Sequence, residues 1–391
     1  MKGLIAPVAR LAVISGVILS LGVAAAGCGS SSSSSSSGGS ASSAVASSGG
    51  STSHSQVKAL LDKYRAMPTF TAPGAAFDAE AKAHGKTLFV IPASSQIPFV
   101  STIATHMKSI GGTVGVQVSI WQNQGQPSEW VQGMNAAISQ NASAIVLLAG
   151  IDPASLQPQI QAAKAKGIPT IVAHLYGEQQ QPAPNLGGLV NIPYELAGQL
   201  IADQAISDSH STNALAVTIN QVKSTVPMVA GIKSQFAAYC SGCKLNTTDV
   251  TIADVATKIQ PNVQSVLTSD PAVNYVLALY DSAEVPFVEA AVRAAGRTGS
   301  VKIATFNGTP EILKQVGKGI VSMDVAENLD WIAYATMDQS MRIMGHLPPV
   351  ADEHIPVRVF DQSNISQAGS DYTSGFGTSY ISGYKKLWGM Q

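Results

Sequence analysis

From residue 87 onward the chain alternates short apolar runs with longer segments in which apolar residues recur every three or four positions. The runs at 87–92 and 144–149 are typical of buried strands, and the segment 98–110 is typical of an amphipathic helix. The same alternation of apolar runs and helix-length segments begins again after Pro193. Strands separated by helix-length segments predict an α/β fold with two doubly wound, Rossmann-like lobes built on parallel sheets. Further helices are predicted at 127–140, 194–207, 261–269 and 285–295.

The N-terminus carries a different pattern: basic residues followed by an apolar run from Leu11 to Ala26. This is typical of a secretory signal, and the small residues before Cys28 resemble a bacterial lipobox, in which the cysteine receives the lipid. The alternative is an uncleaved anchor, but a spanning helix needs about 20 apolar residues and this run is shorter. We therefore predict a lipoprotein signal peptide over 1–27. Lipid on Cys28 would hold the exported protein at the outer face of the cytoplasmic membrane, in the cell envelope.

A low-complexity segment follows the signal: between residues 29 and 55, 21 of 27 positions are Ser or Gly. Such a sequence cannot bury apolar surface and behaves as a flexible coil. We interpret residues 28–55 as a tether that holds a folded body away from the membrane. Residues 56–85 then form an N-terminal extension that we expect to pack on one lobe.

Charge narrows the class of protein further. Lys and Arg number 23 and Asp and Glu 24, which gives a formal net charge of −1. Charged residues make up 12% of the chain, about half of the roughly 25% typical of soluble proteins. This balance excludes a basic nucleic-acid binder, a charge-rich disordered protein and a coiled coil.

With Cys28 assigned to the lipid, the remaining cysteines form the motif Cys240-Ser-Gly-Cys243. A CxxC motif outside the membrane could be a local disulfide, half of a zinc site or a redox centre. Zinc would need a second pair of ligands, which the sequence does not offer, and a thioredoxin-type centre would follow the first strand of its fold. The oxidising compartment favours a structural disulfide between Cys240 and Cys243.

The sequence contains no phosphate loop, no GxGxxG and no GxSxG nucleophile motif. Its seven histidines are scattered and do not form a metal-like pattern with other ligand-type residues. We therefore expect no cofactor, no metal and no catalytic residue, and nothing nominates the chain as an enzyme.

Four segments in order, at 91–107, 151–173, 261–271 and 303–316, resemble the ribose-type, type I periplasmic binding proteins, the solute receptors of ABC importers. The resemblance covers about residues 86 to 345. It implies two Rossmann-like lobes joined by a three-segment hinge, with the ligand clamped between them. Carried over, lobe 1 spans 86–190, lobe 2 spans 191–325, and 326–391 is the hinge return to lobe 1 and the C-terminal segment. LacI-type repressors share this fold but carry a helix-turn-helix where this chain has an export signal.

The resemblance also places the ligand-contacting positions of the family. They fall on Ser94, Ser95, Phe99, His174, Tyr176, Met228, Tyr280, Asp281, Asn307 and Glu327, with Trp331 as a second candidate for the last. Where ribose-type members have an Asp-Arg pair this chain has His174 and Leu175, and it has Met228 and Asn307 in place of an Arg and an Asp. A cleft with fewer charges is expected to take a ligand less polyhydroxylated than ribose. The alternative is that some of these residues support the fold and do not contact the ligand.

The resemblance implies a monomeric solute-binding receptor that captures a sugar or sugar-like ligand and delivers it to an ABC transporter permease. Two alternatives stay open on the sequence alone. The same clamp could report to a transmembrane signalling protein, or the fold could carry an extracytoplasmic enzyme.

Overall fold

The computed structural model describes residues 48–209, 211–372 and 375–390. The predicted signal peptide, Cys28 and most of the predicted tether lie outside the described residues. Helix α1 (Ser48–Arg65) begins within the predicted tether, so residues 48–55 are helical and not coil as expected. The helix continues into Val57 and Leu61, which are buried, and their burial stabilises it despite the low helix propensity of its first residues.

The first sheet has the strand order β2-β1-β3-β4-β5, and every pair is parallel. Leu88 and Val90 of β1, an interior strand, face one hydrophobic core, while Phe89 and Ile91 face another. Both faces of this strand are thus buried, which explains why its sequence is continuously apolar. The strands are β1 (Thr87–Pro92), β2 (Gln117–Ile120), β3 (Ala144–Leu148), β4 (Thr170–Ala173) and β5 (Gly188–Val190).

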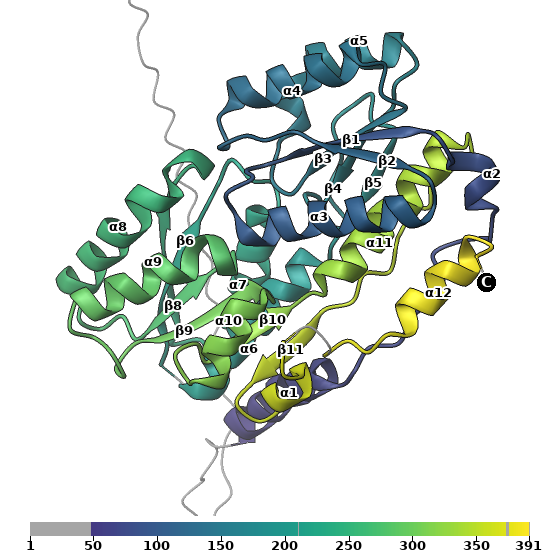
Figure 1. Cartoon of the computed structure of the whole chain (residues 1–391). Coiled ribbons are helices and arrows are strands. Elements are labelled where there is room, and N and C mark those ends of the chain that lie inside the picture. Colours follow the sequence, from purple (N-terminus) through teal and green to yellow (C-terminus); the bar gives the residue numbers. More distant parts are fainter. Residues whose placement is uncertain (1–47, 210, 373–374, 391) are drawn as a thin grey trace, which may run out of the picture. The chain divides into compact units, whose positions relative to one another are not determined.

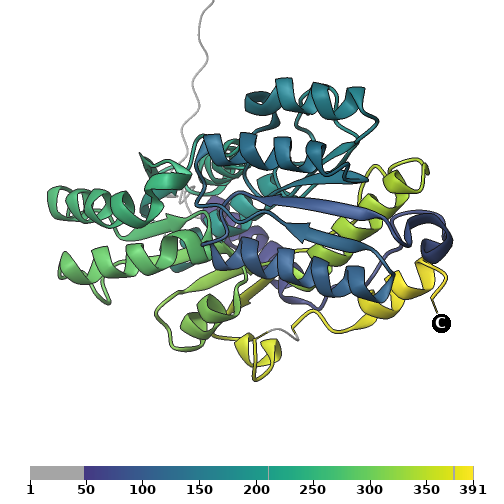
Figure 2. The same cartoon turned by 45° about the horizontal axis from the view of Figure 1, so that its top comes forward.

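Helices cover both faces of this sheet (Figures 1 and 2). On one face lie α4 (Pro127–Ser139) and α5 (Gln157–Ala165), the latter entered through the 3₁₀ turn η1 (Pro153–Leu156). On the other face, α3 (Pro98–Thr113) packs against α11 (Leu329–Met344). Proline occupies the first turn of α3 and of α4, where it has the right φ and no hydrogen bond is lost.

The second sheet has the order β11-β10-β9-β8-β6-β7. Its pairs are parallel except that β11 runs antiparallel to β10, with Met323 opposite Asp361. The strands are β6 (Asn213–Thr218), β7 (Lys244–Asp249), β8 (Tyr275–Ala278), β9 (Lys302–Asn307), β10 (Met323–Ala326) and β11 (Arg358–Asp361). Two mostly parallel sheets flanked by helices confirm the predicted fold class.

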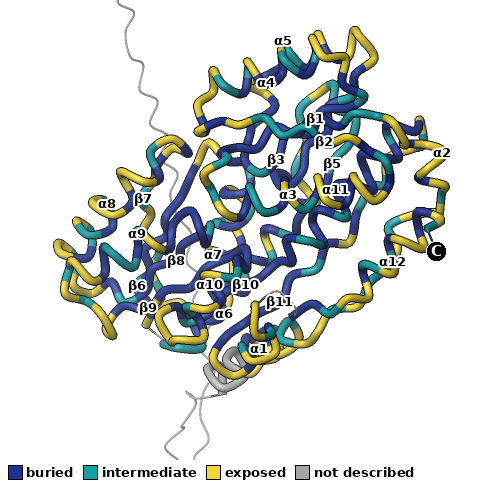
Figure 3. Tube along the Cα trace, viewed as in Figure 1, coloured by how far each residue is buried: buried dark blue, intermediate teal, exposed yellow. Residues whose placement is uncertain are grey.

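The helices of the second lobe also form two layers. Apolar residues of α6 (Tyr194–Asp208) and α7 (Thr225–Tyr239) belong to one hydrophobic core, and those of α8 (Val255–Ser269) and α9 (Asp281–Ala294) to the other. Further short elements are η2 (Ile252–Asp254), α10 (Pro310–Gly317) and η3 (Ile365–Ala368). Figure 3 shows the strands buried and the exposed residues gathered on the outer sides of the helices.

Two helices begin earlier than the sequence analysis predicts. α8 starts at Val255 rather than at Pro261, and α9 starts at Asp281 rather than at position 285. Pro261 and Pro286 both lie inside their helices. Near a helix N-terminus a proline removes a single backbone hydrogen bond, and the buried apolar residues on either side hold the helix together.

The chain passes between the lobes at 190–194, at 326–329 and again between α11 and β11. Residues 326–391 are therefore shared, because α11 packs against α3 and β5 whereas β11 completes the second sheet. The sequence analysis did not predict β11, which is short and has charged residues at both ends.

The N-terminal extension contacts both lobes, not one as expected. α1 packs on α6, α7 and β11, whereas α2 (Ala79–Ala83) packs on α11. The C-terminal segment also runs from the second lobe to the first. It begins at β11 and ends in α12 (Ser379–Leu387), which packs against α11. The two segments are joined at both ends: Arg65 Nε donates to Asp361 at 2.8 Å, and the Phe77 N–H donates to the Leu387 carbonyl at 2.8 Å.

Candidate ligand-binding site

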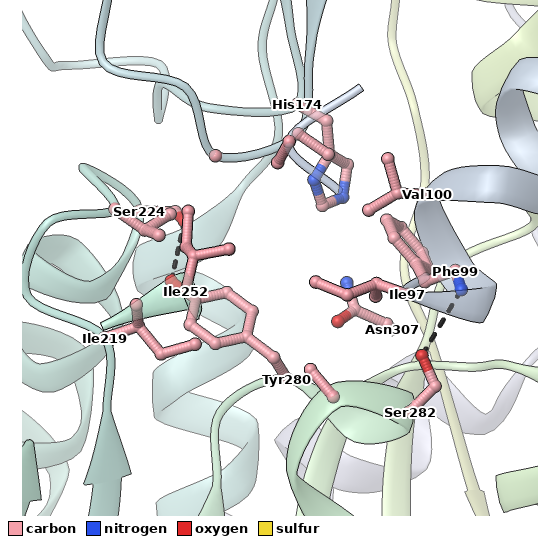
Figure 4. Close-up of a pocket in the computed structure, with 15 residues that line it drawn as sticks. Ile97, Phe99, Val100, His174, Ile219, Ser224, Ile252, Tyr280, Ser282 and Asn307 are labelled. Carbon is pink, nitrogen blue, oxygen red and sulfur yellow. Dashed lines mark hydrogen bonds between the residues drawn. The ribbon is translucent and has the colours of Figure 1, made fainter. Parts of the chain in front are cut away.

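A cavity lies between the lobes, beside the carboxyl ends of the strands of both sheets (Figure 4). Ligands of open α/β sheets bind at this edge. The cavity volume is about 50 Å³, so the two walls stand close together in this structure. The first lobe contributes Ala93, Ile97, Phe99, Val100, Ala149, Gly150 and His174. The second contributes Ile219, Val222, Ser224, Ile252, Tyr280, Ser282, Ala283 and Asn307.

Phe99 forms part of the first-lobe wall and also touches the second lobe. It follows Pro98 in the first turn of α3, where backbone N–H groups have no partner within the helix. Its own N–H donates to Ser282 Oγ of α9 at 3.3 Å. The ring of Phe99 lies 4.8 Å from that of His174, centroid to centroid. Phe99 therefore belongs both to the cavity wall and to the contact between the two lobes.

His174 is the centre of a buried hydrogen-bond network at the hinge. Its Nε2 lies 2.7 Å from Glu327 Oε2 and its Nδ1 lies 2.9 Å from the Tyr194 hydroxyl. Asn307 Nδ2 donates to the same Glu327 oxygen at 3.1 Å. His174 has φ 57° and Asn307 has φ 131°, so both side chains are aimed by strained backbone, of the kind that gathers at binding sites. The network joins β4 of the first lobe to the ends of β9 and β10.

Tyr280 forms the facing wall, at the N-cap of α9. Its hydroxyl lies 2.8 Å from both Ser224 Oγ and Thr225 Oγ1. Burial raises the pKa of Tyr280 above its ordinary value, so the phenol is neutral at physiological pH. Ser224 and Thr225 hold the hydroxyl, and the ring of Tyr280 forms part of the cavity wall.

The neighbouring Asp281 serves the turn after β9 rather than the cavity. One of its carboxylate oxygens accepts from the N–H and the hydroxyl of Thr309, each at 2.6 Å, and the other accepts from the Ser282 N–H. Burial raises the pKa of Asp281 to about 7, and the hydrogen bonds from Thr309 and Ser282 oppose that rise. Asp281 thus holds the loop that carries Asn307.

Of the residues expected at the site, Phe99, His174, Tyr280 and Asn307 line the cavity. Others do not line it: Ser94 accepts from the Gln96 N–H within the loop after β1, Ser95 accepts from the Asn123 N–H of the loop after β2, and Glu327 holds His174.

Three further candidates lie in packed interior. Tyr176 accepts from the Ala183 N–H at 3.1 Å. Met228 is buried where α7 crosses α6 at Gly198. Trp331 stacks on Tyr380 of the C-terminal segment. None of these three lines the cavity.

The sequence analysis did not single out the aliphatic lining, chiefly Ile97, Val100, Ile219, Val222 and Ile252. A partial signal was available, because several of these residues follow the carboxyl ends of predicted strands. Their apolar character is the same as that of core residues, so the pattern alone could not assign them to a ligand.

Cys240 and Cys243 are joined in a disulfide with their Cα atoms 5.3 Å apart, as predicted. In the part of the chain that the structure describes, no group of three or more metal-ligand side chains is placed to hold an ion. Within the same residues no helix combines the length and apolar character needed to cross a bilayer.

Two doubly wound lobes, a hinge crossed several times and a cavity between the lobes define a two-lobed solute-binding protein. The family model described as periplasmic binding protein domain matches residues 88–346, and the chain belongs to this family. The expectation from the sequence is thus confirmed, and the family is one of binding proteins. A comparison with curated proteins finds no match.

Solved structures share the fold at low sequence identity. An ABC sugar transporter subunit from Rhodobacter sphaeroides 2.4.1 is 17% identical, with TM-score 0.62 over 72% of this chain and 99% of its own. A carbohydrate transporter from Acidothermus cellulolyticus 11B in complex with myo-inositol is 19% identical, with TM-score 0.63 over 75% and 99%. The 5-methylthioribose transporter solute binding protein from Thermotoga lettingae TMO, with 5-methylthioribose, is 15% identical, with TM-score 0.64 over 79% and 94%.

Proposed function

We propose that this protein captures a small solute between its lobes outside the cytoplasmic membrane and delivers it to the permease of an ABC importer. The observation that carries the proposal is a cavity whose walls come from both lobes at the carboxyl ends of their strands. Family membership supports it, as do structural neighbours named as ABC sugar transporter and solute-binding proteins.

Closure follows from where the ligand would sit. A ligand that touches Phe99 on one side and Tyr280 on the other gains full contact only when the lobes are together, so it stabilises the closed state. In this structure the lobes are also linked by the hydrogen bond between Phe99 and Ser282 and by the contact between His174 and Glu327. Binding energy is thereby converted into a shape that a permease could recognise.

We assign direct ligand contact to Phe99, His174, Tyr280 and Asn307. Glu327 and Asp281 act as positioning residues, because they hold His174 and the loop of Asn307. Ser94 and Ser95 shape the loop after β1 and stand behind the ligand. Tyr176 and Met228 are left out of the proposed site, since their side chains are committed to the interior.

The cellular setting is part of the proposal. Lipid on Cys28 would anchor a monomer to the outer face of the membrane, and the Ser- and Gly-rich segment would let the lobes reach the permease. In this proposal lobe 1 spans residues 86–190 and lobe 2 spans residues 191–325. Replacing Cys28→Ser should release the protein from membranes, whereas a lipid-free product that stayed membrane-bound would argue against the anchor.

The decisive test is a thermal-shift screen of the purified protein against neutral sugars, polyols, nucleosides and small cyclic alcohols. A ligand that binds only the native state raises the melting midpoint by mass action. Ala283→Leu, which fills the cavity from α9, should abolish the shift. Ala294→Leu makes the same change at an exposed position of the same helix and should leave the shift intact. A shift that persists in Ala283→Leu would place binding elsewhere.

A further inference from the structure

We propose that the ligand is a small, uncharged, ring-shaped compound with two apolar faces and only two or three hydrogen-bonding groups, gathered along one edge. The inference rests on the proposed function and narrows the chemical class of solute that the cavity accepts. It departs from myo-inositol and tagatopyranose, the polyhydroxylated compounds named for two structural neighbours.

The first observation is a pair of apolar walls that face each other. Figure 4 shows Ile219, Ile252 and the Tyr280 ring on one side and Ile97 and Phe99 on the other. Val100 extends the second wall. Two apolar walls bury both faces of a flat ring, and each face gains from leaving water only if it carries few polar groups.

The second observation is that the polar side chains of the lining already have partners in the protein. The Tyr280 hydroxyl lies within hydrogen-bond distance of Ser224 and Thr225. Both ring nitrogens of His174 are engaged, one by Glu327 and one by Tyr194. These residues therefore present ring carbons to the ligand rather than donors and acceptors.

Unused hydrogen-bonding capacity remains mainly at one edge of the cavity. Asn307 gives one amide hydrogen to Glu327, which leaves its carbonyl oxygen and a second amide hydrogen. The Ser282 hydroxyl accepts from the Phe99 N–H, so its own hydrogen is free to be donated. Two such groups match a ligand with two or three hydroxyl or carbonyl groups on one edge.

The charge of the ligand and the number of its hydroxyl groups limit which compounds the cavity can bind. Among the described residues that line the cavity there is no Asp, Glu, Lys or Arg to pair with an ionised ligand. A hydroxyl that is buried without a partner weakens binding by about tenfold. A compound with a hydroxyl on every ring carbon would bury several in this way, and we expect it to bind poorly.

Calorimetric titration of the purified protein with two compounds of one ring size tests the inference. cis-Cyclohexane-1,2-diol and myo-inositol share a six-carbon ring and differ in carrying two or six hydroxyls. We expect the diol to bind at least tenfold more tightly. Val100→Thr keeps the side-chain volume and adds a hydroxyl to the cavity wall, so it should lower affinity for the diol at least threefold. Val226→Thr is the control, since Val226 is 62% exposed and does not line the cavity.

Equal or tighter binding of myo-inositol would overturn the inference while leaving the solute-receptor function intact. Unchanged affinity for the diol in Val100→Thr would overturn it as well, because the apolar wall would then not touch the ligand. If neither compound binds, the inference fails, and the thermal-shift screen decides separately whether the chain is a solute receptor at all.

Discussion

Asp203 in α6 is a buried carboxyl group, and neither of its oxygens has a hydrogen-bond partner among the described residues. Burial raises the pKa of Asp203 to about 7, well above the 3.8 of an exposed aspartate. Well below pH 4 the group is neutral in both the folded and the unfolded chain. As pH rises from 4 to 7 the unfolded state gains stability by ionising, so the free energy of unfolding falls; above pH 7 this contribution is constant.

We therefore predict that Asp203→Asn, measured by urea denaturation, is more stable than the original protein at pH 8 by about 2–4 kcal/mol. At pH 4 the variant should be equal or slightly less stable, because its amide is also unpartnered. Glu195→Gln changes an exposed acid of the same helix and should show no such crossover. A stability difference independent of pH would refute the account of Asp203.

The buried contact between His174 and Glu327 predicts a second residue-scale effect. Both side chains are almost fully buried, so His174→Ala leaves Glu327 with the Asn307 amide but without the imidazole as a partner. His174→Ala should lower the free energy of unfolding by about 1–3 kcal/mol. In a double-mutant cycle with Glu327→Ala, the paired change should cost clearly less than the sum of the single changes. Additive costs would show that the two residues do not stabilise each other.

The residue scale also shows how far the sequence could predict the site. Phe99 and Asn307 lie within matched family segments, and both line the cavity. Met228 was expected at the cavity from the resemblance alone, but it is buried where α7 crosses α6. One-dimensional spacing gives the order of residues but not the direction of a helix face. Ile219 and Ile252 are indistinguishable in sequence from core residues, so only the fold assigns them to the cavity.

At the scale of elements, α6 and α7 cross at two glycines. A Cβ atom on Gly198 would lie 2.0 Å from the Met228 carbonyl oxygen, and one on Gly231 would lie 2.1 Å from the Glu195 carbonyl oxygen. Backbone cannot move aside as a side chain can. We predict that Gly198→Ala lowers the free energy of unfolding by about 3 kcal/mol, at the upper end of overpacking costs.

Gly112→Ala is the matched control for that helix contact. Gly112 lies in α3, and a Cβ atom there would meet nothing within 4 Å. Alanine has the higher helix propensity, so this change should leave the melting temperature unchanged or raise it slightly. Equal destabilisation by the two substitutions would mean that helix contact does not explain the role of Gly198.

Strands with an apolar run were predictable, whereas β5 and β11 were not. β1 and β3 are buried on both faces, and their sequences are continuously apolar. β5 has only three residues, and the two apolar residues of β11 are flanked by Arg358 and Asp361, so neither strand shows such a run. β11 is held by pairing with β10, and that long-range contact has no local sequence signal.

At the scale of the whole described body, the lobes are linked by more than the hinge. The N-terminal extension and the C-terminal segment each run from the second lobe to the first and are tied together by Arg65 with Asp361 and by Phe77 with Leu387. Opening of the lobes must therefore be compatible with these paired segments. The sequence predicted neither passage, because both depend on contacts between residues about 300 positions apart.

The most direct test of the account is a crystal structure of the protein with the first neutral compound that raises its melting temperature. The account predicts that the compound lies between Phe99 and Tyr280, contacts both lobes and hydrogen-bonds to Asn307. A compound bound to one lobe alone, or outside this cavity, would contradict the claim that the chain captures its solute by closing the lobes around it.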